Sequence, residues 1–319
     1  MVEPVSVNST TSGSPTAAAT AVLLVVDGHA YAYRAFHAIR QLAAPDGAPT
    51  NAIFGFIKML AKIRDRLQPT HVAVVWDGGL AAERLAALPE YKAQRPPMPP
   101  GLERQLDEIA AYLQAAGLAS FCREGVEADD WIAAMARQAE RQGVRVIIAS
   151  SDKDFMQLVS DRVGLVSPND KSEAIWTDEQ VRQKTGVAPA QIVDWLSLVG
   201  DTVDNIPGVP GVGPKTATEL LGRFGSVEAL YARLPEVAAQ KMRLNLNASA
   251  ADVRRNQRLI RLNDDLGIEW ALDDVAVRPA EVERLGQLFA RWGFRTMLRE
   301  LTGQAADQGE LFGRPASNQ

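Results

Sequence analysis

The stretch Val22-Leu23-Leu24-Val25-Val26-Asp27 is an apolar run that ends in an acidic residue, and this pattern returns along the first half of the chain. Four more runs rich in Val, Ile and Leu are predicted as short strands: His71–Trp76, Gly117–Cys122, Val144–Ala149 and Val163–Val166. Helical patterns separate them at Asn51–Leu67, Gly101–Ala116 and Asp129–Gln142. Because strands and helices alternate, we predict an α/β fold with an open, mostly parallel, twisted sheet flanked by helices.

Length and composition are those of an ordinary globular protein. The 319 residues suffice for one large domain or two modest ones, with 46% hydrophobic and 23% charged residues. The single cysteine, Cys122, excludes an intramolecular disulfide, and three histidines give no cluster for a zinc site. No stretch approaches the roughly 20 apolar residues of a membrane span. We therefore expect a protein of a reducing compartment, in the cytoplasm.

The composition shifts along the chain and suggests four segments. Residues 1–20 are rich in Ser, Thr, Ala and Val without a basic start, so we expect a disordered tail rather than a signal peptide. An α/β domain is expected at 21–176, and a helical domain with Gly- and Pro-containing connections at 177–303. A second disordered tail is expected at 304–319. Within the first domain, 78–101 carries five prolines and is predicted as an irregular, mobile, arch-like connection.

Acidic residues follow the predicted strands instead of scattering. Asp27 follows the first strand, Asp77 the second, and Asp152 and Asp154 the fourth. In open parallel sheets, ligands bind in the crevice outside the carboxyl ends of the strands, so these side chains are expected to converge on one crevice. Two further groups add carboxylates, at the start of a predicted helix and in a short loop: Glu127, Asp129 and Asp130, and Asp201 and Asp204.

Each of these carboxylates has a structural explanation when taken alone. An aspartate after a strand is most often a helix N-cap, and acidic residues in a first helical turn favour the helix dipole. Nine carboxylates near one crevice would nevertheless repel one another unless cations neutralised them. With oxygen ligands and no Cys or His cluster, Mg²⁺ is the expected ion, with Mn²⁺ as a substitute, and two such ions support phosphodiester hydrolysis. Setting the nine carboxylates aside changes the formal charge from −5 to +4, which suits a nucleic-acid partner.

A glycine-rich turn between two predicted helices supplies a second motif, Gly208-Val209-Pro210-Gly211-Val212-Gly213-Pro214-Lys215-Thr216-Ala217. This pattern is typical of a helix-hairpin-helix, in which glycines admit a phosphate to the backbone and the next helix points N–H groups at it. A nucleotide-binding P-loop is excluded because Pro214 separates Gly213 from Lys215. A dinucleotide fingerprint fails as well, because Thr216 stands where its third glycine belongs.

Seven motifs follow one another along the chain: Val26-Asp27-Gly28-His29, Tyr33-Arg34-Ala35-Phe36-His37-Ala38, Tyr91-Lys92-x-x-Arg95, Glu127-Ala128-Asp129-Asp130, Ser151-Asp152-Lys153-Asp154, Gly200-Asp201-x-x-Asp204-Asn205-Ile206-Pro207-Gly208 and Gly211-x-Gly213-x-Lys215-Thr216-Ala217. Together they resemble the 5′-nuclease (5′–3′ exonuclease, flap endonuclease) domain family of bacterial DNA polymerase I. The resemblance implies a resolvase-like, PIN-like core followed by a helix-hairpin-helix domain. It also implies metal-dependent hydrolysis of DNA near 5′ ends or at 5′-flap junctions, in replication and repair.

The resemblance assigns all nine carboxylates to the metal site. The family usually continues into a proofreading-like domain and a polymerase, whereas this sequence ends at Gln319. We therefore expect a stand-alone nuclease or an isolated domain, acting as a monomer.

The resemblance also implies roles for residues outside the carboxylate group. Lys92 and Arg95 are expected to offset phosphate charge during catalysis, and Arg34 to contact phosphate. Tyr91 is expected to stack on a base of a frayed 5′ end, or else to anchor its segment by packing. Arg84 aligns with an arginine of the family and is expected to contact DNA. The hairpin residues expected to hold duplex DNA are Gly208, Gly211, Gly213, Lys215 and Thr216.

In the C-terminal tail, Gln308-Gly309-Glu310-Leu311-Phe312 resembles the short peptide by which bacterial replication proteins dock on the sliding clamp. The expected partner contacts are Gln308, Leu311 and Phe312, unless Leu311 and Phe312 fold back near Trp292 and Phe294. Two other functions stay open: a metal-dependent ribonuclease of the PIN type and a non-catalytic protein that binds DNA junctions. The ribonuclease would not need a hairpin for duplex phosphates, and the non-catalytic protein would be expected to have lost carboxylates.

Overall fold

The computed structural model describes residues 21–170, 174–268 and 270–303, and in this part of the chain the sheet has five parallel strands in the order β3-β2-β1-β4-β5. The strands are β1 (Val22–Asp27), β2 (His71–Trp76), β3 (Ala119–Cys122), β4 (Arg145–Ala149) and β5 (Val163–Val166). The predicted parallel sheet is confirmed, and no strand bound differs from its prediction by more than two residues. The strand order reverses between β1 and β4, which makes their carboxyl ends the expected place for a ligand.

Successive strand residues face opposite layers, and each layer is a separate apolar core. Leu24 and Val26 of β1 pack with α1 (Gly28–Ala38), α2 (Asn51–Leu67) and α4 (Pro100–Ala115). Leu23 and Val25 pack against α5 (Ala128–Arg141) on the other face. Both faces are covered, so the strands are apolar along nearly their whole length.

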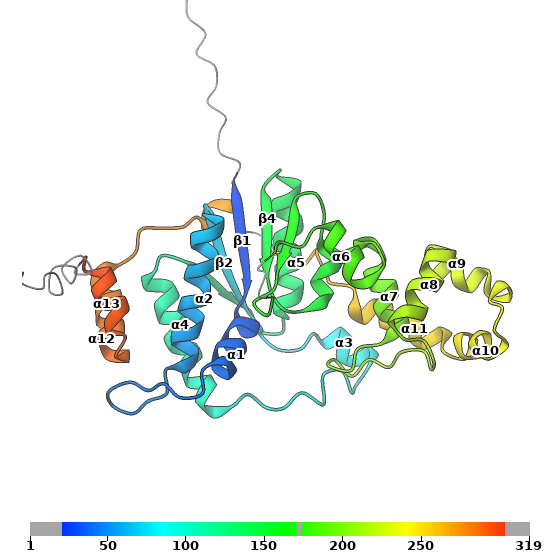
Figure 1. The fold of residues 1–319 in the computed structure, drawn as a ribbon, viewed down its shortest axis with the longest axis horizontal. Helices are drawn as coiled ribbons and strands as arrows, with labels where there is room; N and C mark the ends of the chain where they lie inside the picture. The colour runs from blue at the N-terminus through cyan, green and yellow to red at the C-terminus, as the bar shows by residue number, and fades with distance from the viewer. Residues whose placement is uncertain (1–20, 171–173, 269, 304–319) are drawn as a thin grey trace, which may run out of the picture.

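The second core continues from the sheet into a helical lobe, drawn in green to yellow at one side of Figure 1. The lobe contains α6 (Asp178–Thr185), α7 (Ile192–Val199), α8 (Pro214–Phe224), α9 (Val227–Ala232), α10 (Gln240–Ala248) and α11 (Ala250–Ile260). Short 3₁₀ turns join these parts at η1 (Lys153–Leu158), η2 (Pro189–Gln191) and η3 (Leu234–Glu236). Leu196 of α7 and Leu221 of α8 are buried in the core that also holds Leu23, so the lobe is fixed to the sheet.

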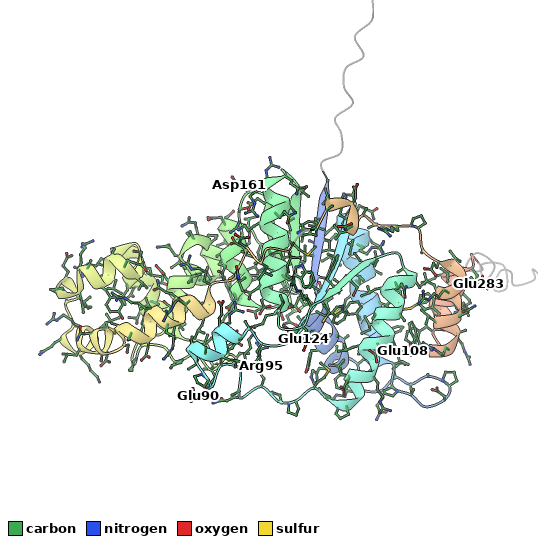
Figure 2. All side chains as sticks on the ribbon, turned by 180° about the vertical axis from the view of Figure 1, so that it is seen from behind. Glu90, Arg95, Glu108, Glu124, Asp161 and Glu283 are labelled. Atoms are coloured by element: carbon green, nitrogen blue, oxygen red, sulfur yellow. The ribbon has the colours of Figure 1, made fainter. Side chains whose placement is uncertain are left out.

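After α11 the chain returns to the sheet through η4 (Leu272–Val275) and ends in α12 (Val282–Trp292) and α13 (Arg295–Leu301). These two helices lie at the opposite end of the molecule from the helical lobe (Figure 1). The indole Nε1 of Trp292 donates to Glu108 of α4 at 3.0 Å, and Arg291 pairs with the same carboxylate. Figure 2 labels Glu108 and, on α12, Glu283. The residues expected as one helical domain, 177–303, therefore pack in two separate places.

The segment at 78–101 differs from the expected irregular connection. It contains α3 (Ala82–Ala87), followed by a turn in which Tyr91 and Lys92 are buried. Figure 2 shows Glu90 and Arg95 on the part that leads from α3 towards α4. The amide of Asn205 donates to the Glu90 carbonyl at 2.9 Å, so the helical lobe holds this turn. The number of prolines in the segment could not predict these contacts, because they depend on residues of the helical lobe.

No helix among the described residues is both long and apolar enough to span a membrane.

Candidate active site

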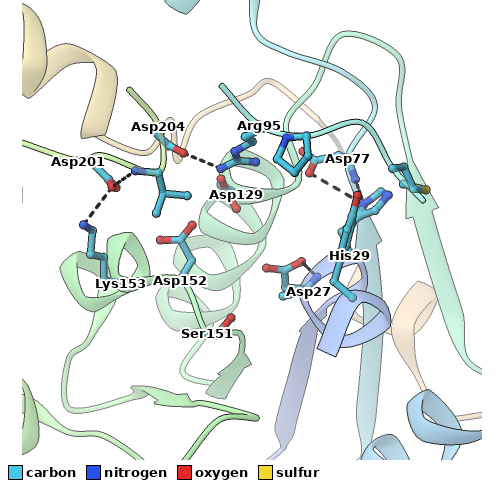
Figure 3. Close-up of a pocket in the computed structure, with 15 residues that line it drawn as sticks. Asp27, His29, Asp77, Arg95, Asp129, Ser151, Asp152, Lys153, Asp201 and Asp204 are labelled. Carbon is cyan, nitrogen blue, oxygen red and sulfur yellow. Dashed lines mark hydrogen bonds and ion pairs between the residues drawn. The ribbon is translucent and has the colours of Figure 1, made fainter. Parts of the chain in front are cut away.

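The carboxyl ends of β1, β2 and β4 open onto a cavity of about 660 Å³ at the junction between the sheet and the helical lobe. Figure 3 shows its acidic lining: Asp27 and Asp77 on one side, Asp201 and Asp204 on the other, and Asp129 and Asp152 between them. The predicted convergence of strand-end carboxylates on one crevice is thus seen in the structure.

Asp27 caps α1 and is buried at the floor of the cavity. Its Oδ1 accepts a hydrogen bond from the Ala30 N–H at 2.9 Å, and its Oδ2 accepts from the Ser150 hydroxyl at 2.8 Å. Burial, with a smaller effect from the charges of Asp77 and Asp152, raises the pKa of Asp27 to about 6 against the lowering effect of these hydrogen bonds. The capping explanation is therefore correct for Asp27, and it leaves a carboxylate that favours a bound cation.

Asp77 joins the end of β2 to the start of α5. Its Oδ1 accepts from the N–H of Ala128 at 2.9 Å, while its own N–H donates to Nδ1 of His29 at 3.1 Å. Because Nδ1 accepts, the proton of a neutral His29 ring lies on Nε2. His29 was not among the predicted site residues, although it stands in the motif Val26-Asp27-Gly28-His29.

A second group of carboxylates lies close together around Asp154. Burial, followed by the charges of Asp152, Asp204 and Asp201, raises the pKa of Asp154 well above its usual value. Burial and the charge of Asp152 do the same for Asp129. Oδ1 of Asp154 is buried without a hydrogen-bond partner. One carboxylate oxygen each from Asp154, Asp201 and Asp204 lies within 4.8 Å of the others.

This arrangement fits a divalent metal ion. An unpartnered buried carboxylate oxygen is costly, and a hard cation would satisfy it together with its acidic neighbours. The donors are all oxygens, which suits Mg²⁺, Mn²⁺ or Ca²⁺ better than a thiophilic metal. Of the predicted ligands, Asp27, Asp77, Asp129, Asp152, Asp154, Asp201 and Asp204 line this cavity or belong to the cluster beside it.

Glu127 and Asp130, also predicted as ligands, pair with cations of the chain itself. The Nζ of Lys92 lies 2.5 Å from Glu127, and the guanidinium of Arg84 lies 2.9 Å from Glu127 and 2.6 Å from Asp130. Although burial alone would raise it, the charges of Lys92 and Arg84 lower the pKa of Glu127 to about 2. Glu127 and Asp130 thus have internal cationic partners, and their role as metal ligands stays a prediction.

Other cations sit at the rim of the cavity. Nη2 of Arg95 lies 2.6 Å from Asp204, and Nζ of Lys153 lies 3.2 Å from Asp201. Lys153, like Ser150, was not predicted, although it separates Asp152 from Asp154 in the sequence. Lys92 is more deeply placed: its residue is 6% exposed and its φ of +56° lies in the left-handed region.

Three residues that were predicted to contact DNA do not line the acidic cavity: Arg84, Tyr91 and Arg34. The Arg84 side chain is buried between the carboxylates of Glu127 and Asp130, whose negative charges it neutralises. Tyr91 is buried with its hydroxyl 3.3 Å from Glu127, which matches the packing-anchor alternative and not an open stacking platform. Arg34 is exposed on α1 and is not among the residues that line the cavity.

The predicted hairpin connects α7 to α8 through a loop anchored by buried Val209 and Val212. The side-chain amide of Asn245 donates to the Pro210 carbonyl at 2.8 Å. Nε1 of Trp195 donates to the Pro214 carbonyl at 3.2 Å. Neither donor was predicted, because both lie outside the loop in sequence: Trp195 is on α7 and Asn245 is on α10.

Within this loop the predicted glycines differ in their surroundings. A Cβ on Gly208 would meet the Val199 carbonyl oxygen at 2.1 Å, whereas a Cβ on Gly213 would meet nothing within 4 Å. Gly211 has a φ of +81°, and Gly213 is the N-cap of α8. Lys215 is exposed and Thr216 half-buried in the first turn of that helix. The loop thus presents an exposed helix N-terminus of the kind that binds phosphate.

The tails expected at 1–20 and 304–319, including Gln308, Leu311 and Phe312, lie outside the described residues.

Family models and individual relatives both assign this chain to the same family. A family model described as "5′-3′ exonuclease, N-terminal resolvase-like domain" matches residues 22–186, and one described as "5′-3′ exonuclease, C-terminal SAM fold" matches 187–283. The 5′-3′ exonuclease of Aquifex aeolicus is 36% identical over 292 residues, covering 91% of this chain and 99% of that protein. DNA polymerase I of Bacillus caldotenax is 37% identical over 296 residues, covering 92% of this chain.

The chain spans 34% of the length of that polymerase. Among solved structures, a T5 protein co-crystallized with metal ions has a TM-score of 0.63 and 25% identity, covering 88% of this chain and 99% of that one. The catalytic core of Rad2 in complex with DNA substrate shares the fold, with a TM-score of 0.61 and 14% identity. The matched ranges contain both the acidic cavity and the hairpin, and the chain belongs to the 5′-3′ exonuclease family.

Proposed function

We propose that this chain is a structure-specific 5′-nuclease that hydrolyses DNA phosphodiester bonds at 5′ ends and at 5′-flap junctions. The observation that carries the proposal is the acidic cavity at the carboxyl ends of β1, β2 and β4, together with the unpartnered Oδ1 of Asp154 in the carboxylate cluster beside it. Family membership supports nuclease activity, and the exposed hairpin supports a duplex substrate. The cellular role that fits is the removal of primers or flaps in DNA replication and repair.

The residues that would hold Mg²⁺ fall into two neighbouring groups. Asp27, Asp77, Asp129 and Asp152 lie at the carboxyl ends of the strands and the start of α5, and Asp154, Asp201 and Asp204 cluster on the side of the helical lobe. Ions bound there would lower the pKa of the attacking water and stabilise the leaving 3′-oxygen. The carboxylates would orient the bound ions. Without ions, their negative charge would repel a DNA phosphate.

Lys92 and Arg95 are proposed to offset phosphate charge in the transition state. Both now pair with carboxylates, Lys92 with Glu127 and Arg95 with Asp204. Arg95 lies at the rim and is 40% exposed at its side chain, so it can exchange its partner for a phosphate by rotamer change. Lys92 is buried against Glu127 and reaches a phosphate only if the turn that carries it moves.

The hairpin is proposed to hold the duplex arm. The exposed N-terminus of α8 offers backbone N–H groups, and Lys215 adds a charge beside it. Such contacts ignore base sequence and fix the distance from the junction to the acidic cavity. DNA is therefore the proposed partner, and recognition depends on backbone shape.

The proposal is tested with a 5′-flap duplex labelled at either end and incubated with Mg²⁺, Mn²⁺ or EDTA. Short products that carry the 5′ label, made with metal and not with EDTA, are the expected result. Single-stranded RNA of the flap sequence is run beside it, since faster cleavage of RNA would support the ribonuclease alternative. Flap binding without cleavage under all metal conditions would support a non-catalytic junction binder and overturn the proposal.

We also propose a sliding clamp as a second partner, bound through Gln308, Leu311 and Phe312. The support is the sequence resemblance of this pentapeptide together with the burial of its alternative docking place: Trp292 and Phe294 are 3% and 5% exposed. Tethering to a clamp would raise the local concentration of the nuclease at nicks.

A further inference from the structure

We propose that Arg84 is a positioning residue that sets the carboxylates at the start of α5 and ties them to the helical lobe, and that it does not contact DNA. The proposal deepens the nuclease function and rests on it. Arg84 lies on α3, in the segment that was expected to be an irregular connection. It is 7% exposed, and its side chain reaches from α3 to two distant parts of the chain.

Every N–H donor of the Arg84 guanidinium has an acceptor. Nη1 faces Asp130 Oδ2 at 2.8 Å and Glu127 Oε1 at 2.9 Å. Nη2 faces Asp130 Oδ1 at 2.6 Å and the Arg261 carbonyl at 3.4 Å, and Nε donates to the Leu259 carbonyl at 3.1 Å. A guanidinium has five N–H donors, so none is left for a phosphate.

The two sets of acceptors belong to opposite helix ends. Leu259 and Arg261 stand at the C-terminus of α11, where carbonyls lack helical partners and a positive charge is favourable. Glu127 and Asp130 stand at the N-terminus of α5, where carboxylates are favourable. Arg84 therefore joins the end of the helical lobe's last helix to the start of the helix that borders the metal cavity.

These contacts constrain a carboxylate that Arg84 does not touch. Asp129 lies between Glu127 and Asp130 in the first turn of α5 and lines the acidic cavity. Glu127 is also held by the Ala81 N–H at 3.1 Å, and Asp130 by the Asn263 N–H at 2.9 Å. With both neighbours fixed, the first turn of α5 has one orientation, and Asp129 is directed at the proposed metal position.

The sign of a metal-binding change separates positioning from charge. If Arg84 acted by charge alone, its removal would take a cation away from an acidic site and tighten divalent binding. If Arg84 positions the carboxylates, its removal loosens α5 and weakens that binding. Arg84→Lys keeps the charge but loses the planar five-donor fork, so positioning predicts weaker binding in this variant as well.

The experiment measures Mn²⁺ binding without DNA, by titration calorimetry or electron paramagnetic resonance, in wild type, Arg84→Gln and Arg84→Lys. We expect Mn²⁺ affinity to fall about 10-fold or more in both variants. We expect flap affinity to stay within about twofold, with an unchanged salt dependence, and kcat to fall while KM changes little. Arg258→Gln, an exposed arginine of α11, is the matched control and should leave Mn²⁺ binding as in wild type.

Hydrogen exchange gives a second measurement of the same contact. The Asn263 amide should exchange faster in Arg84→Gln than in wild type, because its acceptor Asp130 loses its other partner. If Arg84→Gln does not fold, Arg84→Gln/Asp130→Asn replaces it, since that variant leaves no unpaired charge at position 130.

Two results would overturn the proposal. One is Mn²⁺ affinity that is unchanged or tighter in Arg84→Gln. The other is a flap-affinity loss with a salt slope shallower by about one, which would make Arg84 a phosphate contact. Mn²⁺ binding is measured without substrate, so a wild-type protein that fails to cleave DNA would sink the proposed function and still leave the Arg84 question answered.

Discussion

At the residue scale, the carboxylates in and beside the cavity are of two kinds. Glu127 and Asp130 have their charge matched by Lys92 and Arg84, and the pKa of Glu127 is held at about 2. Asp154 has a buried oxygen without a partner, and burial with neighbouring charges raises its pKa. The unmatched group is the one that divalent ions would stabilise, so ligand removal and pH should act on it most strongly.

Replacing Asp154 by Asn tests the unmatched group directly. Asn keeps the size of the side chain but removes the charge and one strong oxygen ligand, so Mg²⁺-dependent flap cleavage should fall by about 100-fold or more. Flap binding should persist or tighten, since a charge that repels phosphate is lost. Asp161→Asn, at an exposed aspartate far from the cavity in Figure 2, is the control. Wild-type cleavage by Asp154→Asn would contradict the metal assignment.

The raised pKa of Asp27 predicts how the metal-free protein responds to pH. Its folded pKa of about 6 exceeds the usual 3.8, so the folded state binds the proton more tightly than the unfolded state. The stabilisation is complete below about pH 4 and is lost as the pH rises through about 6, at a cost of about 3 kcal/mol in the free energy of unfolding. Glu127, whose pKa is lowered to about 2 from the usual 4.5, gains stabilisation as the unfolded carboxyl ionises and so opposes the Asp27 effect only in the lowest part of this pH range.

Urea unfolding in EDTA at several pH values between 4 and 7 measures this effect. Asp27→Asn should make the loss of stability with rising pH less steep, with the remaining slope due to Asp129 and Asp154, whose pKa values are also raised. Mg²⁺ at pH 7 should restore the stability that the wild type loses. A wild-type free energy of unfolding that rises over this range would contradict the assignment.

Sequence reasoning found the strand-end aspartates because position alone brings them together. Asp27, Asp77 and Asp152 need no more than strands of the right length in a parallel sheet. Arg84 could not be placed in that way. Its acceptors lie 46 residues away at Asp130 and 175 residues away at Leu259, and no local pattern reports such a pairing.

At the element scale, the hairpin offers a matched pair of glycines. Gly213→Ala adds a methyl group in open space at an ordinary φ of −96°, so stability should stay the same or rise by up to about 1 kcal/mol. DNA affinity should nevertheless fall about 10-fold, because the methyl group would stand where a phosphate approaches the backbone. Gly208→Ala should instead lower stability by about 1–3 kcal/mol, since its Cβ would meet the Val199 carbonyl oxygen at 2.1 Å.

Thermal melts and flap binding of the two variants distinguish these effects. If Gly213→Ala binds DNA as tightly as wild type, the loop does not approach phosphate through its backbone.

Lys215 gives the electrostatic counterpart at the same helix end. Lys215→Ala should weaken binding equally across DNA sequences and lower the slope of log affinity against log salt by about one. Binding isotherms on three unrelated flap sequences at four salt concentrations provide the measurement. Unequal losses among the sequences would mean that the hairpin contacts bases.

The segment at 78–101 shows where element-scale prediction stops. Its prolines correctly excluded one continuous helix, but they gave no sign of α3 or of the turn that buries Tyr91. Both depend on partners supplied by the helical lobe, such as the side chain of Asn205 on the Glu90 carbonyl. The expected irregular connection therefore missed α3 and the buried turn, while the mobility of the segment stays a prediction.

At the scale of the whole molecule, the acidic cavity is built from both parts of the chain. The strand ends of the sheet provide Asp27 and Asp77, and the loop after α7 in the helical lobe provides Asp201 and Asp204 (Figure 3). The hairpin lies in the same lobe as Asp201 and Asp204, only a few residues further along the chain. Duplex binding by the hairpin therefore acts on the element that supplies part of the metal site.

The C-terminal end leads to the last prediction. Trp292 and Phe294 already pack with Phe289 and Phe54, so the surface once considered for a fold-back of Leu311 and Phe312 is occupied. Truncation after Ala306 should therefore remove binding to the cognate sliding clamp while flap cleavage without clamp stays within about twofold. Surface plasmon resonance on immobilised clamp and a flap assay measure the two effects, with Leu311→Ala/Phe312→Ala in the full chain as the matched variant. A lower melting temperature or slower clamp-free cleavage after truncation would show that the tail stabilises the nuclease itself, and clamp binding that survives truncation would place the contact elsewhere.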